Sequence, residues 1–84
     1  MRYQNEGHFV EAWKTGSTPD YPEWMAQFQE GKHYIIASDG SIDLLGGPNV
    51  TAADLDPGDW LIYDNGYLTW MPDVKFRSVY VPVG

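Results

Sequence analysis

Two dipeptides, Asp39-Gly40 and Asn65-Gly66, constrain the fold of this chain more than any other feature of its sequence. Asp-Gly and Asn-Gly readily adopt the positive φ angles that a two-residue β-hairpin turn requires. Short apolar runs flank each dipeptide, at residues 33–38 and 41–45 around the first and at residues 60–63 and 67–70 around the second. The sequence therefore predicts two β-hairpins and a mainly antiparallel sheet.

Further strands are predicted outside the hairpins. Residues 8–14 alternate with a period near two, which divides their side chains between two faces: Phe9, Glu11 and Trp13 on one, Val10 and Ala12 on the other. Residues 79–83 are predicted as a last strand that either lies at a sheet edge or ends at Pro82, because proline cannot donate a ladder hydrogen bond. Pro57-Gly58 predicts a tight turn over residues 56–59. Residues 50–55 fit either a turn of helix or a short strand.

One helix is predicted over about residues 21–30. Asp20 and Glu23 have the spacing of a capping box, and Pro22 suits the first turn because its missing N–H costs little there. Apolar side chains then follow the helical spacing of a buried face: Tyr21, Trp24, Met25 and Phe28. Gly31 suits the left-handed C-cap. We expect this helix to cover one face of the sheet.

These elements predict the α+β class in a single domain, residues 1–84. About five to seven short strands would form a small, twisted and partly closed sheet with one helix packed on it. A helical turn predicted over residues 74–77 carries Phe76 inward. The predicted core consists of Val10, Trp24, Met25, Phe28, Ile35, Leu61, Ile62, Phe76 and Tyr80.

The charge of the chain argues against several classes of function. Five Lys and Arg stand against 12 Asp and Glu, for a formal net charge of -7. Binding to phosphates requires clustered Lys and Arg, so direct binding of nucleic acid or an anionic membrane is not expected. The absence of Cys excludes disulfides and thiol chemistry. There is no apolar run of the ~20 residues that a membrane helix needs, and no signal segment is expected.

The acidic residues are unevenly distributed. No Lys or Arg stands between Lys32 and Lys75, and this stretch carries Asp39, Asp43, Asp54, Asp56, Asp59, Asp64 and Asp73. Such a stretch would attract a basic partner surface and speed the encounter with it. Asp is also a common turn residue, and the stretch is rich in turns, so a purely structural role for each Asp remains the alternative.

The sequence carries no recognisable catalytic or metal-binding motif. Residues 54–59 hold three carboxylates but lack the distal Glu of a calcium loop. His8 and His33 lie outside any catalytic motif and are expected at the surface or at strand edges. Glu11 is flagged because a half-buried carboxylate among aromatic rings can have a raised pKa, the alternative being a structural acid or a solvent-facing one. Gly46-Gly47-Pro48 lacks the Lys of a phosphate loop. We therefore expect no enzyme, no catalytic residue, no metal and no cofactor.

The aromatic residues suggest an interaction surface. Trp and Tyr are too numerous for a small sheet to bury them all, and they are the usual anchors of protein interfaces. The candidate partner-binding residues combine them with neighbouring acids: Asp54, Asp56, Asp59, Asp64, Trp60, Trp70, Tyr63 and Tyr67. The alternative is that Trp60 pairs with Tyr67 or Trp70 across the second hairpin and serves stability.

Several short motifs occur together along the chain. They are Pro57-Gly58-Asp59-Trp60-Leu61-Ile62, then Pro72-Asp73-Val74-x-Phe76 and Tyr80-x-Pro82-Val83, with Met1-Arg2-Tyr3 and Val10-Glu11-Ala12-Trp13 before them. In this combination the chain resembles a recurrent family of small tailed-phage and prophage proteins of unassigned function. It departs from that pattern at residues 4–7, where a basic run is usual, and at Gly66-Tyr67, where a Gly-Glu pair is usual. The resemblance implies a phage origin and a setting in the cytoplasm of a bacterial host.

Acidity and resemblance together predict a phage accessory protein that binds a host protein and inhibits or redirects it. In one version it is an acidic mimic of nucleic acid that occupies the basic groove of a nucleic-acid-handling or defence protein. The alternative is a virion structural or assembly protein, or a homo-oligomer, that associates through residues 79–83 or exposed Trp side chains. A third hypothesis is a small-ligand binder with an aromatic pocket around Trp13 and Trp60.

Overall fold

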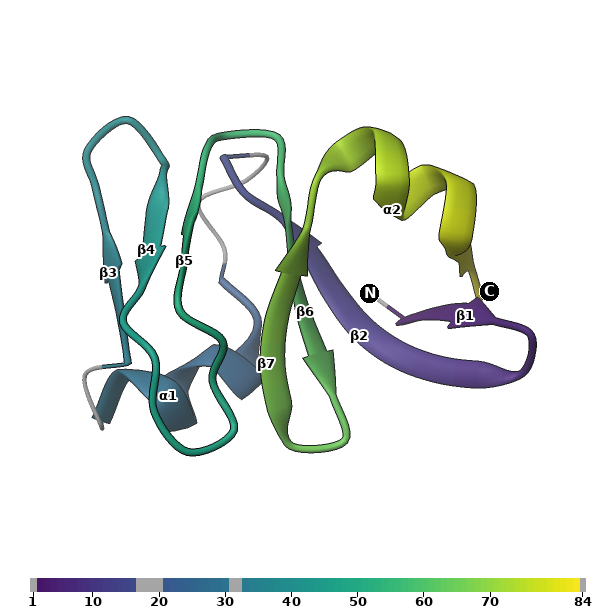
Figure 1. Cartoon of the computed structure of the whole chain (residues 1–84), viewed down its shortest axis with the longest axis horizontal. Coiled ribbons are helices and arrows are strands. Elements are labelled where there is room, and N and C mark those ends of the chain that lie inside the picture. Colours follow the sequence, from purple (N-terminus) through teal and green to yellow (C-terminus); the bar gives the residue numbers. More distant parts are fainter. Residues whose placement is uncertain (1, 17–20, 31–32, 84) are drawn as a thin grey trace.

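The computed structural model describes residues 2–16, 21–30 and 33–83. Within these ranges the chain is α+β, as predicted, with eight strands in two antiparallel sheets (Figure 1). The strands are β1 (Arg2–Asn5), β2 (His8–Lys14), β3 (Tyr34–Ile36), β4 (Ile42–Leu44), β5 (Ala53–Leu55), β6 (Trp60–Asp64), β7 (Tyr67–Met71) and β8 (Val81–Pro82). A 3-10 turn (Glu23–Met25) leads into helix α1 (Ala26–Glu30), and helix α2 (Asp73–Val79) follows β7.

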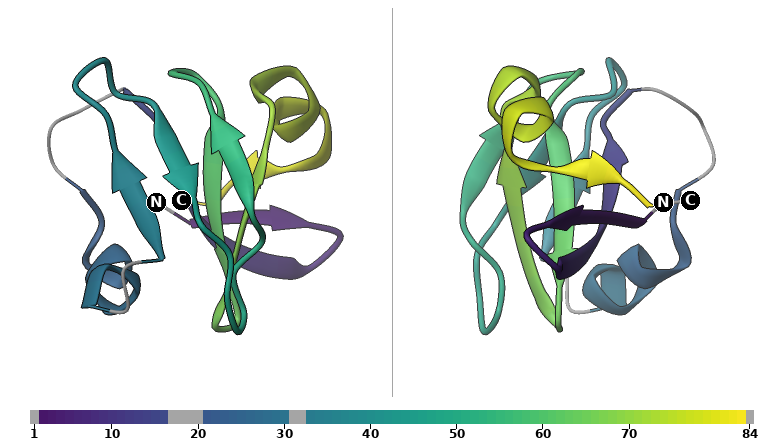
Figure 2. Two further views of the ribbon diagram at one scale, coloured as in Figure 1. Left: turned by 60° about the vertical axis from the view of Figure 1, so that its left-hand side comes forward. Right: turned by 90° about the vertical axis from the view of Figure 1, so that its right-hand side faces the viewer.

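The two sheets are joined into one curved layer. The larger sheet has the order β7-β6-β2-β1-β8 and the smaller one the order β3-β4-β5. Residues beside β5 link them, because the N–H of Leu68 donates to the carbonyl of Asn49 at 2.7 Å and the N–H of Thr51 donates to the carbonyl of Leu68 at 3.0 Å. Figure 2 shows α1 and α2 on different sides of this layer.

Both predicted hairpins form, but the β3–β4 connection is longer than the predicted two-residue turn: Ala37 and Ser41 are joined by a backbone hydrogen bond of 2.9 Å, and of the dipeptide Asp39-Gly40 only Gly40 has a positive φ. Asn65 and Gly66 have φ angles of 49° and 90° and connect β6 to β7. The N–H of Gly40 donates to the carbonyl of Ala37 at 3.0 Å and closes the β3–β4 hairpin. In the predicted turn over residues 56–59, a similar bond of 3.0 Å joins its first and last residues. The chain reverses at each of these places as expected because a few residues decide the local geometry of a turn.

A third hairpin was not predicted. Glu6 and Gly7, with φ angles of 51° and 85°, connect β1 to β2. Glu has no preference for positive φ, so the dipeptide gave no turn signal. With β1 included, the number of strands in the described residues exceeds the predicted five to seven.

The predicted helix over residues 21–30 begins later than expected. Pro22 is extended, with φ −61° and ψ 147°, so helical geometry starts only at Glu23. Tyr21 therefore lies outside the helix, and its exposed ring packs 5.0 Å from the ring of Trp13. The proposed caps at Asp20 and Gly31 fall outside the described residues.

Two other boundaries differ from the prediction. The helical turn expected over residues 74–77 is the longer helix α2, which takes up the start of the strand predicted over residues 79–83 and leaves β8 with two residues. Pro82 does lie in an edge strand, one of the two predicted alternatives. The undecided segment at residues 50–55 contains strand β5.

The interior of the described chain contains two cores instead of one. The larger core lies between α1 and the two sheets and consists of Trp13, Met25, Phe28, Ile42, Leu44, Val50, Leu55, Leu61 and Leu68. The smaller core lies under α2 and consists of Val10, Ala12, Ile62 and Phe76. The predicted core position of Ile35 is wrong: its side chain is 55% exposed, because its neighbours Tyr34 and Ile36 face inward. Trp24 and Tyr80 are half-buried.

Substitution of Phe76 tests how much the smaller core contributes to stability. The Phe76 ring is 1% exposed, so we expect Phe76→Ala to lower the free energy of unfolding by about 3–5 kcal/mol. Val74 lies on the same helix and is 77% exposed, so Val74→Ala should change the free energy of unfolding by less than about 0.5 kcal/mol. Urea unfolding of both variants measures the difference. A loss below about 1 kcal/mol for Phe76→Ala would show that α2 is not held by this core.

Candidate functional site

The outer face of the three-stranded sheet brings acidic side chains together. Ile42, Leu44 and Leu55 point into the core, so strand alternation turns Asp43 and Asp54 outward. The register then pairs Asp43 with Ile35 on one side and with Asp54 on the other. The result is an exposed cross-strand row in which two carboxyl groups are direct neighbours.

These two carboxyl groups interact with each other. A hydrogen bond between them is the main cause that raises the pKa of Asp43, with desolvation and the charges of Asp54 and Asp39 adding to it. Like charges directly opposite each other in a sheet are destabilising. The raised pKa of Asp43 means that its charged form is less favourable in the folded protein than in the unfolded chain.

Apolar side chains border the same row. Ile35 is 55% exposed and lies directly opposite Asp43, and Leu45, which follows β4, is 50% exposed. Asp39, in the β3–β4 turn, accepts hydrogen bonds from the hydroxyl and the N–H of Ser41 at 2.6 and 2.9 Å, which lower the pKa of Asp39. We call the surface formed by Ile35, Asp39, Asp43, Leu45 and Asp54 the acidic face.

The turn over residues 56–59 stands at the same end of the sheet. The Thr15 hydroxyl lies 2.8 Å from the carbonyls of both Asp56 and Asp59, and the Asp59 carboxylate accepts the N–H of Asp56 at 2.9 Å. A Cβ on Gly40 would lie 4.0 Å from the Pro57 ring, so the two turns meet at their tips. Asp56 and Asp59 thus adjoin the acidic face, and the Asp59 side chain also holds the turn together.

Asp64 does not belong to this group. It ends β6, four residues beyond Trp60, and its carboxylate lies 2.9 Å from Nε2 of His8. The structure therefore brings Asp54, Asp56 and Asp59 towards one end of the molecule and places Asp64 elsewhere.

The four candidate aromatic residues are divided between the two faces of the larger sheet. Trp60 lies on the α2 side, where it stacks on Phe76 with ring centroids 4.1 Å apart. Tyr63 lies on the other side, stacked 5.4 Å from Trp24. Trp70 packs against the larger core. Tyr67 is exposed, and its hydroxyl accepts a hydrogen bond of 3.3 Å from Thr51.

The expected cross-strand pairing of Trp60 with Tyr67 or Trp70 is wrong. The register places Trp60 opposite Met71, and Trp70 opposite Leu61. The pocket suggested around Trp13 and Trp60 is also not formed, because Trp13 lies opposite Leu61, whose side chain alternates with that of Trp60. The two indole rings are therefore on opposite faces of the sheet.

Asp73 is a second charged centre, at the start of α2. Nε1 of Trp60 donates to its Oδ1 at 2.9 Å, Nη2 of Arg77 lies 3.1 Å from its Oδ2, and Nζ of Lys14 lies 3.7 Å from its Oδ1. The Trp60 hydrogen bond is the main cause that lowers the pKa of Asp73, and the charges of Arg77 and Lys14 lower it further. Asp73 is thus a stable anion in a locally cationic setting.

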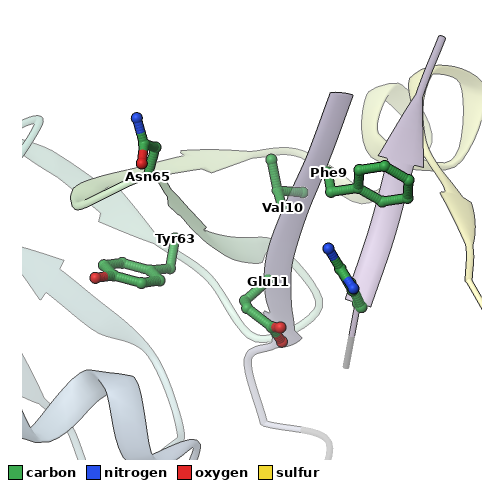
Figure 3. Close-up of a pocket in the computed structure, with 6 residues that line it drawn as sticks. Phe9, Val10, Glu11, Tyr63 and Asn65 are labelled. Atoms are coloured by element: carbon green, nitrogen blue, oxygen red, sulfur yellow. The ribbon is translucent and has the colours of Figure 1, made fainter. Parts of the chain in front are cut away.

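Glu11 lines a shallow pocket of about 210 Å³ (Figure 3). The register pairs Glu11 with Arg2 on β1 and with Tyr63 on β6. The Arg2 guanidinium lies 4.6 Å above the ring of Phe9, a cation–π contact. Glu11 is half-buried and has a cation as its cross-strand neighbour, which favours the structural interpretation of this residue.

The histidines have local partners. Nδ1 of His33 donates to the carbonyl of Gly46 at 3.2 Å, and a Cβ on Gly47 would come within 2.8 Å of the His33 ring. His8 pairs with Asp64. In the part of the chain that the structure describes, no group of three or more His, Asp or Glu is arranged to hold a metal ion.

Of the five residues of the acidic face, Asp54 alone was among the predicted site residues. The alternation of Ile42, Asp43 and Leu44 is a sequence signal that places Asp43 outward. Its position opposite Asp54 depends on a pairing between strands that the sequence does not encode locally.

Comparisons with protein-family models, with curated proteins and with solved structures find no match to this chain. In the described residues, every helix is too short or too polar to cross a membrane.

The Asp43–Asp54 pair has a testable pH dependence. Because the folded-state pKa of Asp43 is raised above 3.8, its charge costs stability at neutral pH, and this cost is relieved as the pH falls towards 3.8. We expect Asp54→Asn to increase the urea midpoint at pH ~7, by a margin that narrows on acidification. Glu23→Gln removes one charge elsewhere and should show no such effect. An unchanged Asp43 pKa in Asp54→Asn, measured by carboxyl NMR, would contradict the interaction.

Asp73 has the opposite pH dependence. Its folded-state pKa lies below 3.8, so its stabilising contribution is present above that value and is lost as the pH falls through the folded-state pKa. Trp60→Phe keeps an aromatic ring but removes the N–H donor. We expect the pKa of Asp73 to rise in this variant and its urea midpoint to fall at neutral pH. Trp70→Phe is the matched control, and an equal rise of the Asp73 pKa in both variants would refute the Trp60 bond as the cause.

Proposed function

We propose that this protein binds a host protein through its acidic face and thereby inhibits or redirects that protein. The observation that carries the proposal is the Asp43–Asp54 pair, which faces solvent and raises the pKa of Asp43. An arrangement that breaks a local stability rule is expected chiefly at functional sites. A cationic group of a partner would remove the repulsion between the two carboxylates.

The composition of the acidic face supports a protein as the partner. Ile35 and Leu45 offer apolar contact area beside the carboxylates, and protein interfaces combine such apolar contacts with a polar rim. A basic surface would be steered towards this face by the net charge of -7. Nucleic-acid-handling proteins carry basic surfaces of this kind, and the acidic side chains would take the place of phosphates there.

The resemblance to small tailed-phage and prophage proteins supports a bacterial host as the source of the partner. We therefore propose a phage accessory protein that acts in the cytoplasm of its host.

The test is capture from bacterial lysate with the tagged protein at about 50 mM and about 500 mM salt. We expect a partner that is recovered mainly at low salt. The double variant Asp43→Asn with Asp54→Asn should lose that partner and slow its association by about tenfold at low salt, because steering depends on the charge of the face.

The matched control is Glu6→Gln with Glu23→Gln, which removes two charges away from the acidic face. Equal recovery by both double variants would contradict a role for the Asp43–Asp54 pair. Duplex DNA added to the lysate should displace the protein if the partner uses a nucleic-acid groove. Recovery of nothing but the protein itself would instead favour the homo-oligomer or virion component.

A further inference from the structure

An aromatic groove lies between α2 and strands β1 and β8, separate from the acidic face. It has a volume of about 370 Å³ and is lined chiefly by Tyr3, Trp60, Phe76, Arg77, Tyr80 and Pro82. Figure 1 shows α2 at the opposite end of the molecule from β3 and β4, and Figure 2 (right) shows α2 above β8 and β1. Its aromatic residues come from β1 (Tyr3), β6 (Trp60) and α2 (Phe76), with Tyr80 directly after α2.

The aromatic rings form the base and the sides of the groove. Phe76 is buried and stacks between Trp60, at 4.1 Å, and Tyr80, at 5.1 Å. Tyr3 stands edge-on to both Trp60 and Phe76, with interplanar angles of 75°. Trp60, Tyr3 and Tyr80 remain half-exposed, so ring surface faces the groove. Flat apolar ligands pack on such surfaces, and the volume is within the range of small-molecule sites, about 300–1,000 Å³.

The charge at the rim of the groove differs from that of the whole protein. Lys14 and Arg77 both approach Asp73, so two cations flank this carboxylate in a chain of net charge -7. Arg77 is 68% exposed, and its guanidinium has five N–H donors, of which the contact with Asp73 uses few. Among the described residues that line the groove, Arg77 is the one with a charged side chain.

Two tyrosines, Tyr3 and Tyr80, also line the groove. Burial raises the pKa of both Tyr3 and Tyr80, and the charge of Asp64 raises that of Tyr80 further. Both hydroxyls therefore stay protonated, and uncharged, at neutral pH. The Asp64 carboxylate itself is engaged by His8 at 2.9 Å.

We propose that the groove binds a small ligand made of one planar aromatic ring system and one anionic group. The ring system packs against Trp60 and Tyr80, and the anionic group pairs with the outward N–H donors of Arg77. Arginine recognises carboxylate and phosphate groups through such paired hydrogen bonds.

Three indole compounds of similar size test the proposal. Indole-3-acetate carries an anion, indole-3-acetamide is neutral and tryptamine carries a cation. Titration followed by ¹H–¹⁵N NMR should show indole-3-acetate shifting the Trp60 indole N–H and the Tyr80 amide, with a dissociation constant of about 1 mM. Indole-3-acetamide should bind more weakly, and tryptamine at least about tenfold more weakly than indole-3-acetate.

Variants of α2 separate the ring contact from the charge contact. Arg77→Gln should abolish the preference for the anion while weak ring binding remains. Lys75→Gln removes the same charge from an exposed position outside the groove and should keep the preference. Equal binding of the three compounds, shifts confined to residues of the Glu11 pocket such as Asn65, or no shift at millimolar concentration would overturn the proposal.

Discussion

The pairing of β2 with β6 is the contact on which the rest of the structure depends. Leu61 faces the core under α1, whereas its neighbour Ile62 faces the core under α2, so this strand serves both cores. The same division occurs on β2, where Val10 and Ala12 belong to one core and Trp13 to the other. A sheet buried on both faces needs a cover on each side, and the two helices provide it (Figure 2).

The register that fills the larger core also determines the charge of the outer surface. Ile42, Leu44 and Leu55 must point inward, and a shift of one residue would bury carboxylates in their place. Strand alternation then leaves Asp43 and Asp54 no position other than side by side in solvent. Their repulsion is tolerated because the apolar burial on the other side of the same strands outweighs it.

Local chemistry explains which parts of the fold were predictable. The turns at residues 39–40, 56–59 and 65–66 depend on a few residues, and the sequence indicated each of them. The core position predicted for Ile35 is wrong because all three residues of Tyr34-Ile35-Ile36 are apolar. Such a run does not show which side chain strand alternation turns towards solvent. The charge pattern alone was enough to select Asp54, Asp56 and Asp59 as candidates. The position of Asp54 opposite Asp43 depends on the pairing of β4 with β5, which are separated in the sequence. Likewise, the separation of Trp60 from Tyr63 follows from strand alternation, whereas that of Trp60 from Trp70 requires the register.

The two ends of the molecule have different electrostatic characters. Several carboxylates gather on β4, β5 and the adjoining turns, whereas Asp73 at the start of α2 is offset by Lys14 and Arg77. The longest dimension of the described chain is 32 Å, several times the screening length of about 8 Å at physiological salt. Charges at one end therefore act weakly on ligands at the other. A protein docked on the acidic face would leave the aromatic groove open, so the two proposed sites can be occupied, and tested, independently.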